Sequence, residues 1–194
     1  DTPHTGVMSY DENYDKIPTA ALSMEDAMML GRIHERKQKI TLKLQMEAKT
    51  VGDRWSRNII SEIKGHESPD EIVVVGAHID SWDVGQGAHD DGGGCVASWE
   101  VLRLIKTLGL KPKRTIRCVL WTNEENGLRG SNSYRDMHLD ELDKHVIAIE
   151  SDAGVFAPLG FGFSGNKDAR EVIEDIHELL KPIKANQITD WGRA

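Results

Sequence analysis

The sequence has few cysteines and no long apolar run, and each shortage excludes a class of protein. Only two cysteines, Cys95 and Cys118, occur among its 194 residues. Both stand among apolar neighbours, so we expect buried free thiols rather than a disulfide framework or a cysteine-rich zinc site. No apolar stretch approaches the roughly 18 residues that a membrane-spanning helix requires, so we expect no membrane partner.

Positive charge is also in short supply. The chain has 24 Lys and Arg against 32 Asp and Glu, which gives a net charge of −8, and its basic residues form no stripe. A surface that binds nucleic acid needs such a stripe, so we expect no nucleic-acid partner. Asn-x-Ser/Thr glycosylation sites are absent as well. The apolar content of 39% and the charged content of 29% are typical of a globular protein.

The pattern of the sequence changes at about residue 52. Before that point, Ser23 is placed to cap a helix over residues 24–38. Residues 39–48 then alternate between apolar and polar, as in a strand with one face in water. A polar stretch follows. We therefore predict a small unit over residues 1–52 and a separate domain over residues 53–194.

From residue 53 onward, strand patterns and helix patterns alternate. Residues 71–77 are apolar on both faces, as in a central strand of a parallel sheet. Further strands are predicted over 58–64, 114–122, 145–150 and 159–165. Helices are predicted over 92–109, 131–138 and 167–182, with inward faces that include Val96, Trp99, Leu102, Val172, Ile173 and Leu179. This rhythm predicts an α/β fold, a three-layer sandwich with a largely parallel central sheet.

Three of the predicted strands end in side chains that could bind a cation. The residues at the strand ends are His78, Asp80, Glu124, Glu125 and Asp152, and a Gly-rich loop between them adds Asp90 and Asp91. The carboxyl ends of neighbouring parallel strands open on one edge of a sheet, which is where ligands bind. So many carboxylates would repel one another there unless a cation neutralised them.

A mixture of imidazole and carboxylate suits zinc better than calcium or magnesium. A carboxylate can also bridge two metals about 4 Å apart. Because residues i and i+2 of an extended chain share a face, the carboxylate of Asp80 is expected to reach the outer ring nitrogen of His78. The adjacent Glu124 and Glu125 point in different directions, so one can bind metal while the other faces a substrate water.

Each of these features also has a simpler explanation. A His-x-Asp sequence after a strand is common, and Glu124–Glu125 could form a solvated turn. We expect Asp91 to cap the helix that follows it, with a favourable interaction with the helix dipole. All the simpler explanations would have to hold together, so the convergence of three strand ends favours the metal site.

The motifs VVVGAHIDSWDVGQGAHDDGGG, LWTNEENGLRGS and AIESDAG, in this order, resemble those of the co-catalytic di-zinc exopeptidases, a family of aminopeptidases and glutamate carboxypeptidases. The resemblance covers nearly the whole chain. The segment HTGVMSYDENY is similar to the end of a protease-associated lid domain. The resemblance therefore implies that residues 1–52 are the C-terminal part of such a lid and that residues 53–194 form a zinc peptidase domain.

The same resemblance implies a role for each polar residue. Two zinc ions are expected per complete site, and the metal ligands implied are His78, Asp90, Glu125 and Asp152, of which Asp90 bridges the two ions. The catalytic residues implied are Glu124, as general base toward the attacking water, and Asp80. The peptide bond that follows the bridging aspartate is expected to be cis.

One part of the family pattern is missing. The family supplies a last zinc ligand, a histidine, well downstream of the Asp152 motif. Of the later histidines, His138, His145 and His177, none stands in that context. We therefore expect the Glu125 zinc site to be incomplete and the chain to be a piece of a longer enzyme, with residues missing at both ends.

The sequence thus predicts a zinc-dependent exopeptidase that hydrolyses dipeptides or short peptides. Two alternatives stay open: a single-zinc acyltransferase like the glutaminyl cyclases, and a non-catalytic binding fragment, because this fold can persist after its zinc ligands are lost. The resemblance further implies a secreted or lysosomal protein that forms a homodimer when complete.

Overall fold

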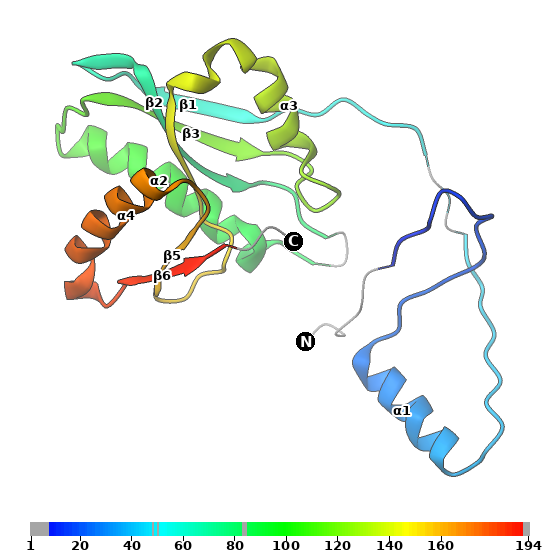
Figure 1. Cartoon of the computed structure of the whole chain (residues 1–194). Helices are drawn as coiled ribbons and strands as arrows, with labels where there is room; N and C mark the ends of the chain where they lie inside the picture. The colour runs from blue at the N-terminus through cyan, green and yellow to red at the C-terminus, as the bar shows by residue number, and fades with distance from the viewer. Residues whose placement is uncertain (1–7, 48, 50, 83–84, 192–194) are drawn as a thin grey trace. The chain divides into compact units, whose positions relative to one another are not determined.

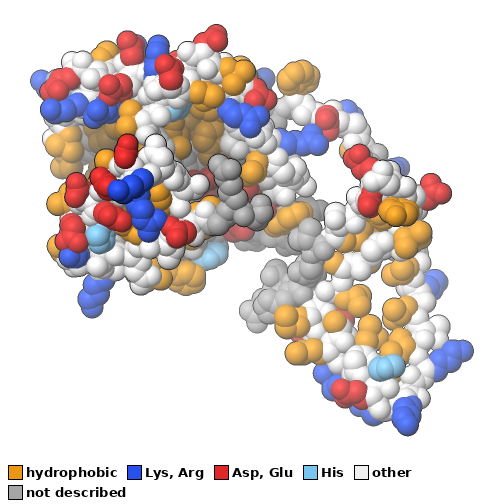
Figure 2. Space-filling view, viewed as in Figure 1, with side chains coloured by type: hydrophobic (Ala, Val, Ile, Leu, Met, Phe, Trp, Pro, Cys, Tyr) orange, Lys and Arg blue, Asp and Glu red, His pale blue; other side chains and the backbone are white. Residues whose placement is uncertain are grey.

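The chain folds into two units, residues 1–55 and residues 56–194. The computed structural model describes residues 8–47, 49, 51–82 and 85–191 (Figure 1). Apolar side chains are exposed at the surface of both units (Figure 2). None of the helices in these described ranges is long and apolar enough to cross a membrane.

The first unit contains one helix, α1, over Met24–Glu35. The predicted cap is confirmed, because the side-chain oxygen of Ser23 accepts a hydrogen bond from the backbone N–H of Asp26 at 3.1 Å. Acidic residues in the first turn complement the positive end of the helix dipole. Every residue of α1 is described and none of them is buried, so the apolar stripe of this helix packs against little.

The predicted strand over residues 39–48 is not formed. Residues 39–47 have no regular secondary structure, and Leu42 and Leu44 on the predicted inner face are exposed. Ala48 and the first residues of the lid-like motif, 4–7, lie outside the described residues. Alternation alone does not form a strand, because a strand needs a neighbouring strand for its backbone groups, and the described part of this unit contains no such strand. The lid assignment stays a prediction.

The second unit is built on a four-stranded sheet. Its strands are β1 (Ile59–Ile63), β2 (Ser68–His78), β3 (Arg114–Trp121) and β4 (His145–Glu150), in the order β1-β3-β2-β4. β2 runs parallel to both β3 and β4, whereas β1 is antiparallel to β3. The prediction of a largely parallel sheet is therefore confirmed.

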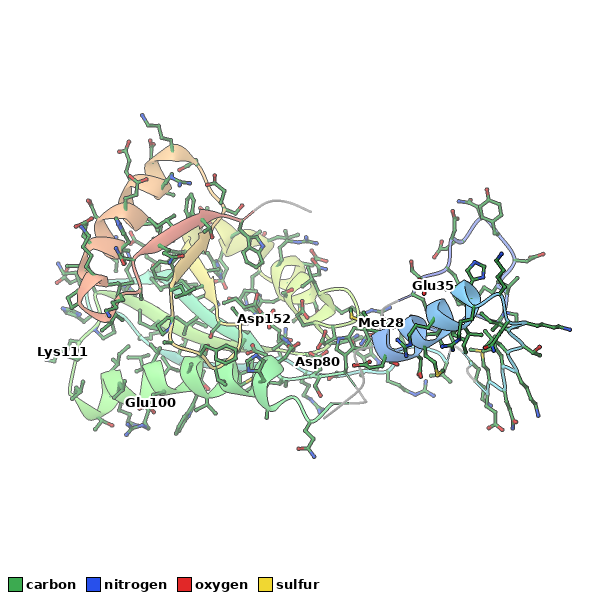
Figure 3. All side chains as sticks on the ribbon, turned by 90° about the horizontal axis from the view of Figure 1, so that it is seen from below. Met28, Glu35, Asp80, Glu100, Lys111 and Asp152 are labelled. Atoms are coloured by element: carbon green, nitrogen blue, oxygen red, sulfur yellow. The ribbon has the colours of Figure 1, made fainter. Side chains whose placement is uncertain are left out.

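Helices cover both faces of this sheet (Figures 1 and 3). On one face, Tyr134 of α3 (Arg129–Met137) joins a buried cluster with Val119 and Trp121 of β3. On the other face lies Cys118, whose neighbour is Cys95 of α2 (Gly93–Thr107). Adjacent strand residues point to opposite faces, so the two helices form separate layers and complete the three-layer α/β sandwich.

The buried face of α2 contains Leu102, as predicted, but otherwise differs from the predicted one. Val96 and Trp99 are exposed, whereas Gly94, Ser98 and Leu102 are buried. The small side chains bring the helix close to the sheet, and the hydroxyl of Ser98 donates a hydrogen bond to the backbone carbonyl of Gly76 in β2 at 3.0 Å. Of the two thiols predicted to be buried, that of Cys118 is buried and that of Cys95 is only half-buried.

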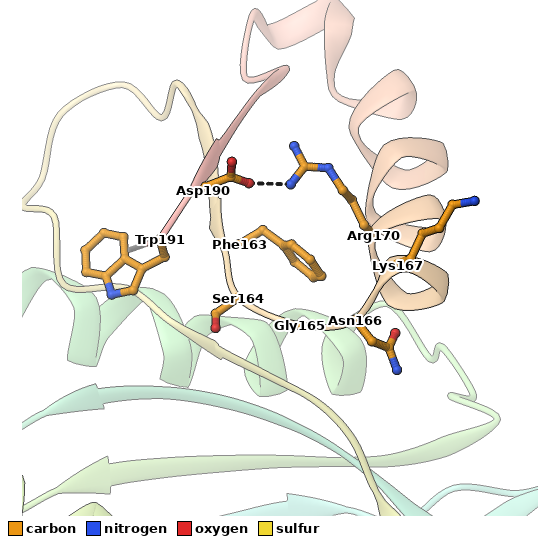
Figure 4. A pocket seen from close by; sticks show the side chains of 8 residues that line it. All are labelled: Phe163, Ser164, Gly165, Asn166, Lys167, Arg170, Asp190 and Trp191. Carbon is orange, nitrogen blue, oxygen red and sulfur yellow. Dashed lines mark hydrogen bonds and ion pairs between the residues drawn. The ribbon is translucent and has the colours of Figure 1, made fainter. Parts of the chain in front are cut away.

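A smaller sheet follows in the sequence. It pairs β5 (Gly160–Phe163) in parallel with β6 (Gln187–Asp190), which was not predicted, and α4 (Lys167–Leu179) connects them. Within α4, which is described in full, Ile173 is buried as predicted, but Val172 and Leu179 are exposed. A cavity of about 330 Å³ lies beside the start of α4, with an ion pair between Arg170 and Asp190 on its wall (Figure 4).

Candidate metal centre

The three polar strand ends meet at one edge of the main sheet. His78 is paired with Trp121 in the register of β2 and β3, and Gly76 is paired with Glu150 in the register of β2 and β4. The carboxyl ends of the three parallel strands are therefore level, as predicted. Figure 3 shows Asp80 and Asp152 together at this edge.

His78 lies at the centre of a group of possible metal ligands. Its Nε2 is 2.9 Å from Oδ1 of Asp90 and 3.3 Å from Oδ1 of Asp152. One ligand atom from each of these three residues lies within 4.8 Å of the other two. The imidazole is only 1% exposed, whereas both carboxylates are accessible to solvent. The group can therefore present a fixed nitrogen and two accessible oxygens to a cation.

The outer nitrogen of His78 has a nearer partner than the predicted Asp80 carboxylate. Nδ1 lies 2.9 Å from the backbone carbonyl oxygen of Asp80, while the nearer carboxylate oxygen of Asp80 is 3.7 Å away. A carbonyl can only accept, so Nδ1 carries a proton and donates it, which leaves Nε2 to face the carboxylates. The imidazole is thus oriented as a ligand requires.

The Asp80 carboxylate instead holds the loop that carries the glutamate pair. Its Oδ1 accepts a hydrogen bond from the backbone N–H of Glu124 at 2.9 Å, and its Oδ2 accepts one from Glu125 at 3.3 Å. Asn123 begins this turn with a positive φ of 54°, and the N–H groups of Gly127 and Leu128 close it on the carbonyl of Glu124. Asp80 therefore ties the end of β2 to the end of β3.

The two glutamates occupy different environments. Oε2 of Glu124 lies 4.0 Å from Nε2 of His78, beside the ligand group. Oε1 of Glu125 is buried and accepts no hydrogen bond from any residue that the structure describes. Within the described ranges, no group of three candidate ligands includes Glu125. Its buried, unsatisfied oxygen nevertheless suits a cation ligand, because a buried polar atom normally has a partner.

Asp91 has the structural role predicted for it. Its carboxylate is 1% exposed, and Oδ1 accepts a hydrogen bond from the N–H of Gly94 in the first turn of α2 at 3.0 Å. Oδ2 accepts a second one, at 3.1 Å, from the backbone N–H of His78. The peptide bond between Asp90 and Asp91 is cis, as the resemblance implied. Asp91 thus joins the start of α2 to the end of β2.

Replacing Asp91 with alanine is expected to destabilise the protein by about 2–4 kcal/mol, because two buried N–H groups lose their acceptor. Urea denaturation, with Asp70→Ala at the other end of β2 as an exposed control, measures this change. A denaturation midpoint equal to that of the control would contradict the role given to Asp91.

The negative charges of the site shift the pKa values of its members. Burial acts to lower the pKa of His78, but the charge of Asp152, the carbonyl of Asp80 and the Asp90 side chain together raise it to about 9. Burial raises the pKa of Glu124 and of Glu125, with nearby carboxylates adding to the rise. This accumulation of unsatisfied negative charge is what a divalent cation would relieve.

Glu150 belongs to the same charged environment, although it was not predicted. Loss of solvent around its carboxyl group raises its pKa to about 7, and Asp152 and Glu124 add to the rise, while part of the residue stays exposed. As the last residue of β4, it sits one position before the polar run that identified Asp152. The strand pattern HVIAIE contains Glu150, but the pattern does not indicate that its carboxyl group lies near Asp152 and Glu124.

The later histidines are used elsewhere in the fold. The ring of His138 stacks on Tyr134, and Nε2 of His145 lies 2.8 Å from the hydroxyl of Tyr134. His177 lies on α4. In the part of the chain that the structure describes, none of the three belongs to the ligand group.

Zinc binding at pH 7 is expected to release about one proton from His78, because a ligand imidazole must be neutral and this one has a pKa of about 9 without metal. The apparent affinity for zinc should rise with pH until about pH 9. The stability of the metal-free protein should change with pH in the opposite direction. The folded state favours the charged form of His78, so this residue stabilises the fold below its unfolded pKa of about 6.5. That stability is lost as the pH rises through 9. Calorimetry in two buffers of different ionisation enthalpy counts the protons, and a count of zero would contradict this charge state.

Residues 58–193 match the protein family described as Peptidase family M28. Carboxypeptidase Q of Homo sapiens is 47% identical over 191 residues, which cover 98% of this chain and 40% of that protein. Carboxypeptidase Q of Xenopus laevis is 46% identical over the same share of this chain and 41% of its own length. The chain therefore spans about two fifths of the length of the curated relatives that it matches.

Two solved structures of peptidases are also similar to this chain. The peptidase M28 precursor from Shewanella amazonensis SB2B has a TM-score of 0.85 and 36% identity over 97% of this chain and 42% of its own. The zinc aminopeptidase of Bacillus subtilis has a TM-score of 0.54 and 26% identity over 68% of this chain and 34% of its own. From the match over residues 58–193, the shared fold and the ligand group at the sheet edge, the chain belongs to peptidase family M28.

Proposed function

We propose that the complete protein is a zinc-dependent exopeptidase that hydrolyses dipeptides or short peptides. The observation that carries this proposal is the convergence of His78, Asp90 and Asp152 within 4.8 Å, with the carboxylate of Glu124 beside them. Mixed nitrogen and oxygen ligands suit zinc. The similarity to carboxypeptidase Q and to a zinc aminopeptidase supports the peptidase assignment.

The residues that would hold zinc are His78, Asp90 and Asp152, and Glu125 would hold a second ion that Asp90 shares. A zinc ion there supplies Lewis acidity toward the scissile carbonyl and toward water. A second ion would need further ligands besides Asp90 and Glu125. We propose that these come from outside the described residues.

Glu124 acts as the proton carrier of the reaction. As water adds to the carbonyl carbon, one of its protons moves to the Glu124 carboxylate, and the same proton then moves to the nitrogen as the C–N bond breaks. The raised pKa of Glu124 suits both transfers, because a base works best when its pKa lies near the working pH. Asp80 keeps Glu124 in place through the backbone N–H.

Three further properties rest on the family resemblance. Residues 1–52 form the end of a protease-associated lid domain, and the complete protein is secreted or lysosomal and forms a homodimer. The resemblance to carboxypeptidase Q over 98% of the chain supports all three proposals.

The test is an assay of dipeptide hydrolysis by the complete protein before and after removal of metal. Hydrolysis should stop on chelation and return when zinc is added. Pyroglutamate formation from an N-terminal glutamine substrate, in place of hydrolysis, would favour the acyltransferase instead. Neither reaction, in a protein that binds zinc, would favour the binding fragment.

A further inference from the structure

A second imidazole, that of His89, lies beside the ligand group without belonging to it. In the residues that the structure describes, the only candidate group contains His78 and not His89. The ring of His89 instead contacts Phe156 edge-on, with the ring centroids 5.1 Å apart. It also covers Gly154, where any Cβ atom would overlap the imidazole ring.

These contacts join the two segments that carry the exposed ligands. Asp90 stands on the segment 88–94, and Asp152 stands on the segment 151–156. Besides His89, the side chain of Val155 packs so closely on Gly93 that a Cβ there would also overlap it. The two segments therefore meet along a seam of ring, glycine and aliphatic contacts.

The seam matters for the ligands, because the two carboxylate side chains themselves have few partners. Among the described residues, the carboxylates of Asp90 and Asp152 form hydrogen bonds or ion pairs with His78 alone. Both side chains are exposed to solvent, at 57% and 41%. Their separation therefore depends on where the two backbones lie. Each backbone is bonded to β2 next to its ligand, through Ser151 to Gly76 and through Asp91 to His78, and the seam is where the two segments contact each other.

We propose that His89 is a positioning residue whose ring holds the 151–156 segment against the 88–94 segment and so fixes the separation of Asp90 and Asp152 around the metal. The inference rests on the proposed zinc site. It assigns His89 a packing role. Another flat aromatic ring should therefore be able to take over this role, whereas a small side chain should not. Gly154 is the matching surface, because its φ of +85° and the ring above it both exclude a side chain.

The experiment measures zinc affinity in the complete protein by competition with a chromogenic chelator. His89→Ala should weaken zinc binding by about 10–100-fold, the usual cost of removing a group that orients a ligand. His89→Phe, which keeps a ring over Gly154, should bind zinc nearly as tightly as the unchanged protein. His66→Ala, which removes an exposed imidazole before the start of β2, is the matched control and should leave the affinity unchanged.

A double-mutant cycle tests the contact itself. Gly154→Ala should weaken zinc binding, and adding His89→Ala to it should recover part of the loss, because the clash with the ring is removed. In the protein with Gly154 unchanged, His89→Ala should instead weaken zinc binding. Thermal unfolding of each metal-free variant shows whether the fold survives.

Two results would overturn the inference while leaving the proposed function intact. One is a normal zinc affinity in His89→Ala. The other is an equal loss in His89→Ala and His89→Phe, which would make the imidazole a ligand. If the unchanged protein bound no zinc, the proposed function and the positioning role would both be wrong. Thermal unfolding of the two single variants and the double variant would then still test whether His89 packs on Gly154.

Discussion

Replacement of Glu124 by glutamine is expected to lower kcat for dipeptide hydrolysis by about 10²–10⁴-fold, the usual contribution of a positioned general base. Glutamine has the same shape but cannot take a proton from water. The backbone N–H of residue 124 would still donate to Asp80, so the loop should keep its place. His78, Asp90 and Asp152 are untouched, so the affinity for zinc should change little.

The measurement is steady-state kinetics together with zinc content for each variant. Glu125→Gln is a matched control in the same turn, because it removes the carboxylate with the buried, unsatisfied oxygen rather than the one beside His78. That control should lower the zinc content as well as the activity. Full turnover in Glu124→Gln would show that another group carries the proton, and the role given to Glu124 would be wrong.

Replacement of Asp90 by asparagine should have the largest effect on metal binding. Asparagine preserves the shape of the side chain and removes the charge that would help to hold the zinc ions. The affinity for zinc should fall by more than about 100-fold, because losing a direct ligand costs more than losing a group that only orients one. The side chain is more than half exposed, so the stability of the fold should change little.

Competition with a chromogenic chelator measures this effect, with two control variants. Asp70→Asn removes an exposed carboxylate near the start of β2 and should leave the zinc affinity unchanged. Asp91→Asn alters the neighbouring carboxylate, which contacts backbone N–H groups, so its main effect should be on stability. A normal zinc affinity in Asp90→Asn would place the metal, if any, somewhere else.

The main sheet and its polar edge could be predicted because they depend on local patterns. A strand that is apolar on both faces, such as residues 71–77, must lie inside a sheet, and parallel neighbours bring their carboxyl ends together. Each of three predicted strands is followed within two residues by a site residue, namely His78, Glu124 or Asp152. Their convergence therefore requires only that these strands are neighbours in the sheet. The capping role of Asp91 is local as well, since its partner Gly94 is three residues away.

Other features depend on contacts that the sequence does not show. The Asp80 carboxylate bonds to a loop 44 residues away, and its choice of that loop over His78 depends on the exact course of both turns. The inward face of α2 follows Ser98 rather than Trp99, because close approach to the sheet favours a small residue. The contact between His89 and Phe156 likewise joins segments that no local pattern connects.

The most direct test of the metal centre is anomalous X-ray diffraction at the zinc absorption edge, from crystals of the complete protein. We expect a peak within about 2.0–2.2 Å of Nε2 of His78 and of a carboxylate oxygen from each of Asp90 and Asp152. A zinc peak elsewhere in the molecule, or none at this edge of the sheet in a zinc-containing crystal, would contradict it.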